Sequence, residues 1–281
     1  MNESSKAVLI TGCSSGIGRS TAELLNDKGW TVYATARRPE SIADLAEKGC
    51  KTLALDVTDE ESMTAAVKAV TDADGAVGVL INNAGYSQSG AVESVPLDQV
   101  RRQFETNVFG LTRMCQLVLP GMRDQRWGKI VNISSMGGRL VFPGGGLYHA
   151  TKYAVEAISD ALRFEVRGFG VDVILIEPGL IVTNFGEAAT ATVPGQADGP
   201  YAKFNDAVGE LTTNAYKGPM AKLGGPPESV AKRIADAIDS KRPKPRYPVT
   251  ASARLMMGQR RITPDRMWDR LMRSQFPTPK A

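Results

Sequence analysis

Histidine and cysteine are scarce in this chain of 281 residues. There is one histidine, His149, and there are three cysteines, Cys13, Cys50 and Cys115. Structural zinc sites need closely spaced pairs of such ligands, so we expect no metal site. An odd and sparse set of cysteines also argues against a disulfide framework. It favours a reducing compartment, and we therefore expect a cytoplasmic protein.

Long apolar runs and dense basic blocks are missing as well. No stretch of about 18 apolar residues occurs, so we expect no integral membrane segment. Residues 1–5 contain no apolar run, unlike a signal peptide or an anchor. The net charge is only +4 and no basic cluster is dense, which argues against a nucleic-acid partner. With 42% hydrophobic residues, the composition predicts one globular domain over 1–281.

Apolar runs alternate with amphipathic segments over the first two thirds of the chain. The predicted strands are 6–11, 31–36, 51–56, 77–82, 129–134 and 171–177, and the predicted helices are 17–28, 39–48, 59–72, 98–124 and 148–167. Near-continuous Val/Ile/Leu runs, as in 173–176, are typical of parallel strands that helices cover on both faces. With right-handed crossovers, this pattern predicts an α/β fold with a single doubly wound parallel sheet of the Rossmann type.

A glycine-rich turn follows the first predicted strand. Residues 6–11 read KAVLIT, and Gly12, Gly16 and Gly18 come before the first predicted helix. Glycines allow a tight turn and a close approach of the backbone to a pyrophosphate, and the following helix points free N–H groups at that anion. Three residues and then one residue separate these glycines, whereas the commoner dinucleotide-binding fingerprint has one and then two. Because the turn lies between a predicted strand and a predicted helix, it predicts dinucleotide binding.

Tyr148 and Lys152 lie four residues apart in a predicted helix, so they share one helix face. A tyrosine has a pKa of ~10 in water, and a nearby positive charge lowers that pKa toward neutral pH. The pair could therefore transfer a proton in general acid–base catalysis. Alone, the spacing would favour a surface pair on an amphipathic helix, but the glycine turn favours the catalytic interpretation.

Together these motifs resemble the classical short-chain dehydrogenase/reductase family over residues 6–183. The chain contains the family's Thr-Gly-x-x-x-Gly-x-Gly turn, its Tyr-x-x-x-Lys pair and, at 178–183, its Pro-Gly-x-Ile/Val-x-Thr motif. The family also has a serine thirteen residues before the tyrosine and an asparagine in the preceding long helix, which are Ser135 and Asn107 here. Residues 32–38 and the Gly-Gly after Ser135 resemble the branch of 17β-hydroxysteroid and retinol dehydrogenases and their bacterial relatives.

The resemblance implies the roles of individual residues. Tyr148 would exchange a proton with the substrate oxygen, which Ser135 would hold by a hydrogen bond. Lys152 would lower the pKa of Tyr148 and bind the nicotinamide ribose, and Asn107 would hold a water. The implied cofactor-binding residues are Gly12, Ser14, Ser15, Gly16, Ile17, Gly18, Arg37, Arg38, Asp56, Val57, Asn83, Ala84, Gly85, Tyr148, Lys152, Pro178, Gly179, Ile181 and Thr183. His149, one position off the catalytic face, is expected to be a bystander.

The end of the second predicted strand indicates the cofactor. An NAD-specific relative would place an acid there to bind the ribose 2′-hydroxyl, but this chain has Ala36 followed by Arg37 and Arg38. Ala36 leaves room for a 2′-phosphate, and Arg37 offers it a charge-assisted bond, so we expect NADP(H). Ser15 stands where another NADP pattern has a basic residue. Two solvated arginines at the start of a loop are the alternative interpretation.

Residues 184–224 form a predicted helical lid over the substrate. Glycine and proline are scattered here among aromatic side chains, and no pair of arginines could bind a carboxylate or phosphate. We therefore expect a small apolar carbonyl or alcohol substrate, although an oligomer contact is an alternative role for the segment. From 241 to 281 a basic tail alternates Lys/Arg with Met, Leu and Trp268. Because prolines interrupt this tail, we favour packing helices over a membrane-surface helix.

These observations predict an NADP(H)-dependent oxidoreductase that transfers hydride between nicotinamide and an apolar ketone or aldehyde, or the matching alcohol. The alternatives are an NAD-dependent alcohol dehydrogenase of the same family and a non-catalytic dinucleotide-sensing protein. The predicted helices 98–124 and 148–167 resemble those that the family packs between subunits. A homodimer or homotetramer is therefore expected.

Overall fold

The computed structural model describes residues 5–194 and 199–279. Residues 1–4, residues 195–198 of the expected lid and residues 280–281 of the expected tail lie outside this description. Within it, seven strands form one parallel sheet in the order β3-β2-β1-β4-β5-β6-β7. The strands are β1 (Ala7–Ile10), β2 (Thr31–Ala36), β3 (Lys51–Ala54), β4 (Val79–Asn82), β5 (Gly128–Ile133), β6 (Val171–Glu177) and β7 (Arg246–Pro248). The order reverses between β1 and β4, which confirms the doubly wound fold.

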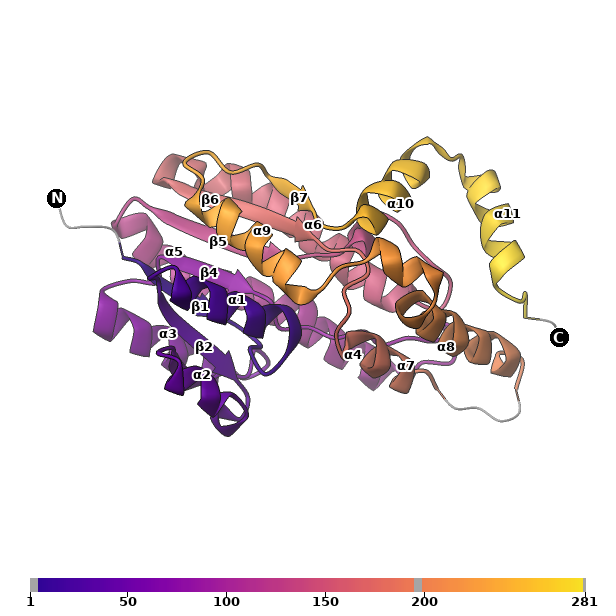
Figure 1. The fold of residues 1–281 in the computed structure, drawn as a ribbon, viewed down its shortest axis with the longest axis horizontal. Coiled ribbons are helices and arrows are strands. Elements are labelled where there is room, and N and C mark those ends of the chain that lie inside the picture. The colour runs from indigo at the N-terminus through magenta and orange to yellow at the C-terminus, as the bar shows by residue number, and fades with distance from the viewer. Residues whose placement is uncertain (1–4, 195–198, 280–281) are drawn as a thin grey trace.

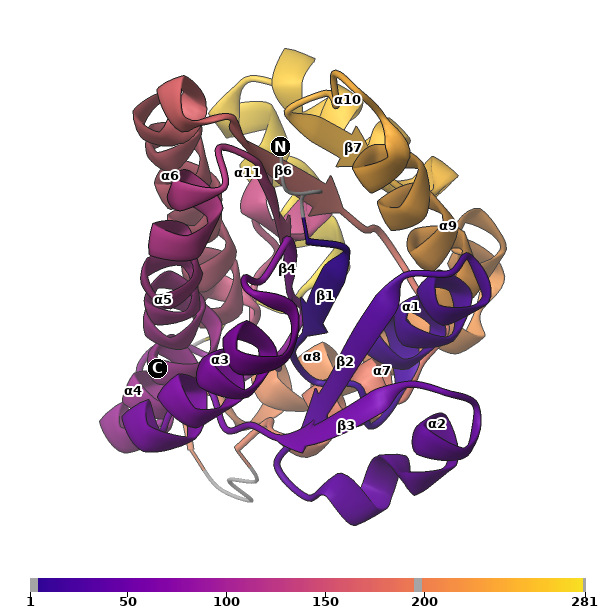
Figure 2. The same cartoon turned by 90° about the vertical axis from the view of Figure 1, so that its left-hand side faces the viewer.

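Helices cover both faces of the sheet (Figures 1 and 2). One layer contains α1 (Gly16–Asp27), α2 (Ala43–Glu47) and α9 (Pro227–Asp239), and the other contains α3 (Glu60–Asp74), α5 (Leu111–Asp124) and α6 (Gly146–Val166). Val8 and Ile10 pack with the first layer, whereas Leu9 packs with the second. This alternation follows from the period of two in a strand, and it explains why both faces are apolar.

The predicted helix over 98–124 is interrupted in the structure. It consists of α4 (Leu97–Phe104), a π-helical segment (Glu105–Gly110) and α5. Gly110 packs on the loop after β3, where a Cβ would lie 2.3 Å from the carbonyl oxygen of Val57. The apolar periodicity of the sequence does not reveal the extra residue that a π-helical turn contains. The π-helical segment places Asn107 on the side of the helix that faces α6, and such segments occur frequently at functional sites.

The segment after β6 is helical, as predicted. It contains α7 (Phe185–Ala191), α8 (Ala202–Lys217) and a short 3₁₀ turn (Pro219–Leu223). Both helices lie beyond the carboxyl ends of the strands (Figure 1). They therefore cover the edge of the sheet where ligands bind in folds of this kind.

Within the expected tail, residues 246–248 form β7 and pair with β6, a strand that the sequence did not predict. Pro248 is the last residue of this edge strand, and the sheet needs no hydrogen bond from a backbone N–H at that position. The chain continues into α10 (Ala251–Ile262) and α11 (Asp265–Gln275), with Pro264 just before the latter. The prolines thus mark element boundaries. The sequence interpretation also missed α9. None of the described helices combines the length and the apolar composition needed to cross a membrane.

Candidate active site

The glycine turn and the loop after β4 form one hydrogen-bonded unit. Asn83 Nδ2 donates to the carbonyl oxygens of Thr11 and Gly12, both at 2.9 Å. Thr11 Oγ1 accepts from the backbone N–H groups of Asn83 (3.0 Å) and Ala84 (2.9 Å). Gly18 has to lack a side chain, since a Cβ would lie 2.4 Å from the Gly12 carbonyl oxygen. The structure therefore brings these predicted cofactor residues together at the switch point between β1 and β4.

The N-terminus of α1 has the properties of an anion site. Ser15 precedes the helix in an extended conformation, Gly12 and Gly16 have positive φ angles of 74° and 58°, and Ser14 is exposed in the turn between them. Within the described structure, no side chain caps α1, and its first turn has no acidic residue. The free amides and the helix dipole therefore favour a pyrophosphate. Gly16 also packs on Thr183, with 3.2 Å from a Cβ to Thr183 Cγ2, so the loop after β6 borders the same site.

The ends of β1, β2 and β3 also meet at this edge. The Cys13 N–H donates to Thr35 O (2.7 Å), and the Leu55 N–H donates to Ala36 O (3.0 Å). Asp56 follows, and its carboxylate accepts from the N–H and the hydroxyl of Thr58. Arg37 and Arg38 are exposed just after β2, and neither forms an ion pair within residues 5–194 and 199–279. Both guanidinium groups are thus free to bind an anion.

Three apolar members of the predicted cofactor set also have packing roles. Ile17 packs against the core on the α1 side of the sheet, and Val57 lies buried beneath Gly110. Ile181 is buried and pairs with Gly225 in an isolated parallel bridge. These side chains hold the backbone of the loops in place.

Ser135, Tyr148 and Lys152 converge at the carboxyl ends of β5 and β6. The Ser135 side chain lies near the Tyr148 phenol, and Ser135 Oγ accepts from the Gly137 N–H at 3.0 Å. Lys152 Nζ lies 5.8 Å from the centre of the Tyr148 ring and donates to the carbonyl oxygen of Ile133 at 2.8 Å. The predicted spacing on one helix face is therefore present, and the serine comes from the loop after β5.

The electrostatics differ from the sequence expectation. Burial raises the pKa of the Tyr148 phenol above its usual range, although the neighbouring Ser135 hydroxyl acts in the opposite direction. Burial also lowers the pKa of Lys152 to about 8, while the charge of Glu156 opposes this shift. Burial penalises the charged form of each group, and in Tyr148 this effect outweighs the lowering of the pKa by Ser135. A phenol that retains its proton is suited to act as a general acid.

Asn107 connects the loop after β4 to α6. Its Oδ1 accepts from the Tyr86 N–H (3.1 Å), while Nδ2 donates to Tyr86 O (2.9 Å) and Thr151 Oγ1 (3.1 Å). A Cβ on Gly85 would lie 3.1 Å from this Oδ1 and 3.8 Å from Lys152 Nζ. Both amide protons of Asn107 are thus used within the protein. The observed contacts give its side chain a positioning role, and the water-holding role stays a prediction.

His149 has contacts that the expectation of a bystander did not include. It is buried, its Nε2 accepts from the Phe142 N–H (3.4 Å), and its Nδ1 lies 3.0 Å from the Gly137 carbonyl oxygen. These partners assign the proton to Nδ1, which donates to Gly137. Burial lowers the pKa of His149, so the ring stays neutral at physiological pH. His149 therefore holds the loop that begins at Ser135. In the sequence, its position next to Tyr148 was the one sign of this role.

The Pro178-Gly179 loop is held from the C-terminal part of the chain. The Leu180 N–H donates to Ser252 Oγ (3.1 Å), and a Cβ on Gly179 would lie 2.4 Å from that oxygen. Thr250, which has a positive φ of 89°, lies against the same glycine. From the other side, Pro178 O accepts from the Met136 N–H (2.8 Å). Sequence reasoning missed Thr250 and Ser252 because it assigned them to a tail.

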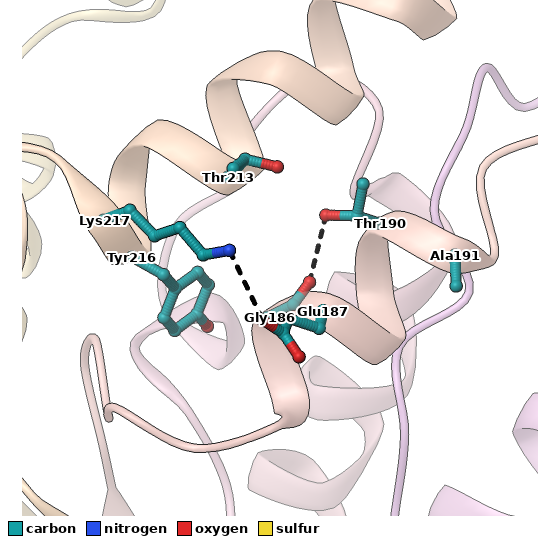
Figure 3. Close-up of a pocket in the computed structure, with 7 residues that line it drawn as sticks. All are labelled: Gly186, Glu187, Thr190, Ala191, Thr213, Tyr216 and Lys217. Carbon is teal, nitrogen blue, oxygen red and sulfur yellow. Dashed lines mark hydrogen bonds and ion pairs between the residues drawn. The ribbon is translucent and has the colours of Figure 1, made fainter.

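The lid contributes aromatic side chains near Tyr148. The Phe185 ring centre lies 5.7 Å from that of Tyr148, and Tyr216 packs on Gly186. A pocket of about 280 Å³ lies between α7 and α8 (Figure 3). Its lining residues are Gly186, Glu187, Thr190, Ala191, Thr213, Tyr216 and Lys217. In Figure 3 the Lys217 side chain reaches across from α8 toward α7, where it forms an ion pair with Glu187 at 3.3 Å.

Other aromatic residues in and near the predicted lid have different partners. Tyr201 donates a hydrogen bond to Glu93 at 2.7 Å, and Phe204 packs on Phe276 with ring centres 6.3 Å apart. Phe142 packs between His149 and Trp268. The described part of the chain contains no group of three His, Cys, Asp or Glu side chains that could hold a metal ion.

Comparisons with known proteins agree with this geometry. Residues 6–194 match the model of the short chain dehydrogenase family. The "Uncharacterized oxidoreductase YbbO" of Escherichia coli is 36% identical over 268 residues, covering 95% of this chain and 94% of the relative. An "NADPH-dependent 3-dehydrocapnine reductase" of Ornithobacterium rhinotracheale is 36% identical over 277 residues, with 94% of each chain covered.

Solved structures give the same result. A short-chain dehydrogenase from Streptomyces avermitilis is 35% identical, with a TM-score of 0.80 and 96% of each chain covered. A serine dehydrogenase complexed with NADP⁺ is 27% identical, with a TM-score of 0.75 and with 87% of this chain and 94% of that one covered. The chain therefore belongs to the short-chain dehydrogenase/reductase family of oxidoreductases, whose members bind nicotinamide dinucleotides.

Proposed function

We propose that the protein is an NADP(H)-dependent reductase of apolar ketones or aldehydes that also oxidises the matching alcohols. The observation that carries this proposal is the half-buried Tyr148 phenol, which lies near Ser135 and beside Lys152. It lies at the same sheet edge as the glycine turn, where a bound nicotinamide cofactor would supply or accept hydride.

Each residue of the group has a proposed chemical role. Tyr148 gives its phenolic proton to the carbonyl oxygen of the substrate during reduction, and Ser135 donates a hydrogen bond to that oxygen. Lys152 is proposed to bind the nicotinamide ribose, since its ammonium lies next to both Tyr148 and Gly85. Asn107 fixes the position of the loop after β4 relative to α6 through its hydrogen bonds to Tyr86 and Thr151. The intact group argues against a non-catalytic sensing protein.

The preference for NADP(H) rests on Arg37 and Arg38. Both are exposed after β2, without an acid at position 36, and are free of ion pairs in the described structure. The relative named as an NADPH-dependent reductase supports the same choice. An NAD-dependent alcohol dehydrogenase is the second candidate. A panel of carbonyls and alcohols, assayed with both cofactors by nicotinamide absorbance, tests cofactor, direction and substrate class together.

The apolar substrate class predicts an effect at Phe185, whose ring lies against Tyr148. Aromatic side chains bury 150–250 Å² each, so we expect Phe185→Ala to lower kcat/KM for an apolar ketone by about tenfold, mainly through KM. Tyr201→Ala is the matched control, because the Tyr201 hydroxyl bonds to Glu93 on the surface. Steady-state kinetics with one apolar and one small polar ketone check the prediction. An unchanged kcat/KM for the apolar ketone would remove Phe185 from the substrate pocket.

His149 provides a second prediction. Replacement by leucine leaves the Gly137 carbonyl and the Phe142 N–H without their partners, and the loop after Ser135 loses its support. Buried polar groups left unpaired cost about 1–3 kcal/mol, so we expect kcat to fall by about tenfold while the Kd of NADPH stays constant. The kcat of the native protein should show no step near pH 6–7, since burial lowers the pKa of His149. A step at that pH which leucine abolishes would instead indicate a proton-transfer role.

We also propose a cytoplasmic homodimer or homotetramer in which 1–281 act as one catalytic domain. The exposed side chains of Phe109, in the π-helical segment, and of Tyr153 and Phe164, on the neighbouring α6, support a contact between subunits at these two elements.

A further inference from the structure

Positive charge is concentrated in the α10–α11 hairpin, residues 251–275. This segment has six arginines and two aspartates, which gives it a net charge of +4. The whole chain has the same net charge of +4, so the rest of the sequence is neutral as a whole. A local field of one sign attracts surfaces of the opposite sign.

Apolar side chains are exposed on the same hairpin. Leu255, Ile262 and Met267 are 58%, 82% and 61% exposed. On α10, Leu255 and Ile262 are seven residues apart and share one face, with the exposed Arg254 and Arg261 beside them. The outer face of the hairpin thus combines large apolar groups with cations.

The inner face is already occupied by the protein. Trp268 Nε1 donates to Val141 O at 3.3 Å, and the Trp268 ring lies 6.2 Å from that of Phe142. Met272 is buried, and Phe276, just after α11, packs on Phe204 of the lid. These contacts hold the hairpin at the carboxyl edge of the sheet, and its turn projects away from the sheet (Figure 1). The outer apolar side chains therefore cannot turn inward without breaking the Trp268 and Met272 contacts.

Most of the arginines have no acidic partner. Within the described residues, the ion pair of the hairpin is that of Arg260 with Asp265, at 2.5 Å, and Arg260 also lies over the Trp268 ring. The unpaired arginines are Arg254, Arg261, Arg266, Arg270 and Arg273. A second copy of this chain, docked through the same surface on a two-fold axis, would bring like charges together. The complementary surface must be anionic and must also accept exposed apolar side chains.

We propose that the α10–α11 hairpin docks the protein on an anionic membrane surface. Ile262, at the end of α10, and Met267, at the start of α11, enter the boundary between headgroups and acyl chains, while Arg261, Arg266 and Arg270 contact lipid phosphates. The hairpin therefore packs on the protein with its inner face, as the sequence favoured, and in addition lies in the membrane interface with its outer face, without spanning the bilayer. This docking does not depend on the proposed reaction, because none of these side chains belongs to the group around Tyr148.

Vesicle sedimentation with the full chain tests the proposal. We expect binding to vesicles of phosphatidylcholine mixed with phosphatidylglycerol, little binding to pure phosphatidylcholine, and loss of binding at high ionic strength. Each arginine near an anionic surface contributes about fivefold in affinity, so the variant Arg261→Gln/Arg266→Gln/Arg270→Gln should bind about 100-fold more weakly. Ile262→Ser/Met267→Ser should also weaken binding, with its salt dependence retained.

Lys68→Gln/Arg101→Gln/Arg102→Gln is the matched control, since it removes three exposed cations from α3 and α4. We expect it to bind as the native chain does. Equal losses in this control would mean that net charge alone attracts the vesicles, and equal binding to both vesicle types would exclude anionic recognition. Light scattering of the hairpin variants gives a further outcome. A change in their oligomeric state would make the hairpin a contact between protein chains and would overturn the proposal.

Discussion

Tyr148→Phe should lower kcat for carbonyl reduction by about 10²–10⁴-fold, the usual contribution of a positioned general acid. The variant lacks only the phenolic oxygen and its proton. Its ring can keep the contacts with Phe185 and His149, whose ring centres both lie 5.7 Å from that of Tyr148. The glycine turn and the loops after β2 and β4 are unchanged, so the Kd of NADPH should stay near its native value.

Single-turnover kinetics and a fluorescence titration of NADPH separate these two effects. Tyr153→Phe is the matched control, because Tyr153 is an exposed tyrosine on the same helix, α6, and its loss should leave kcat unchanged. A Tyr148→Phe variant that retains more than a few per cent of the native kcat would show that another group donates the proton.

Ala36→Asp/Arg37→Ala should reverse the cofactor preference from NADPH to NADH. Arg37 can form charge-assisted hydrogen bonds to a 2′-phosphate, which contribute about 1.5–3 kcal/mol each, or about 10–100-fold in kcat/KM. An aspartate at the end of β2 repels that phosphate but accepts a hydrogen bond from a free 2′-hydroxyl. The measurement is the ratio of kcat/KM for NADPH to that for NADH.

Two further variants make this test specific. Arg37→Lys keeps the charge but loses the bidentate geometry, so it should retain only part of the preference. Arg102→Ala removes an exposed arginine of α4 that forms an ion pair with Asp98, and it should leave the ratio unchanged. A native protein that uses NADH as efficiently as NADPH would refute the assignment of Arg37.

The parts of the fold that could be predicted from the sequence have local signals. Buried parallel strands such as β4 and β6 are continuous apolar runs in the sequence. The glycine turn is recognisable because its backbone adopts positive φ angles that favour glycine. The relation of Tyr148 to Lys152 follows from helix geometry alone. These signals were sufficient to place the proposed site at the carboxyl edge of the sheet.

Features that depend on tertiary contacts could not be predicted in this way. β7 is three residues long and exists through its pairing with β6, so it has no periodicity of its own. The two hydrogen bonds of His149 depend on a loop that returns to α6. The lowered pKa of Lys152 results from burial, which a residue pattern does not specify. Here the long-range environment, and not the residue type, determines the property.

The contact between Leu180 and Ser252, 72 residues apart, has a consequence for synthesis of the protein. The motif that follows β6 reaches its final geometry only after β7 and the start of α10 have left the ribosome. Until then β6 is an open edge strand with unpaired backbone groups, which can pair with other chains. A nascent chain that stalls before residue 246 would thus contain all the residues around Tyr148 and yet expose a surface prone to aggregation.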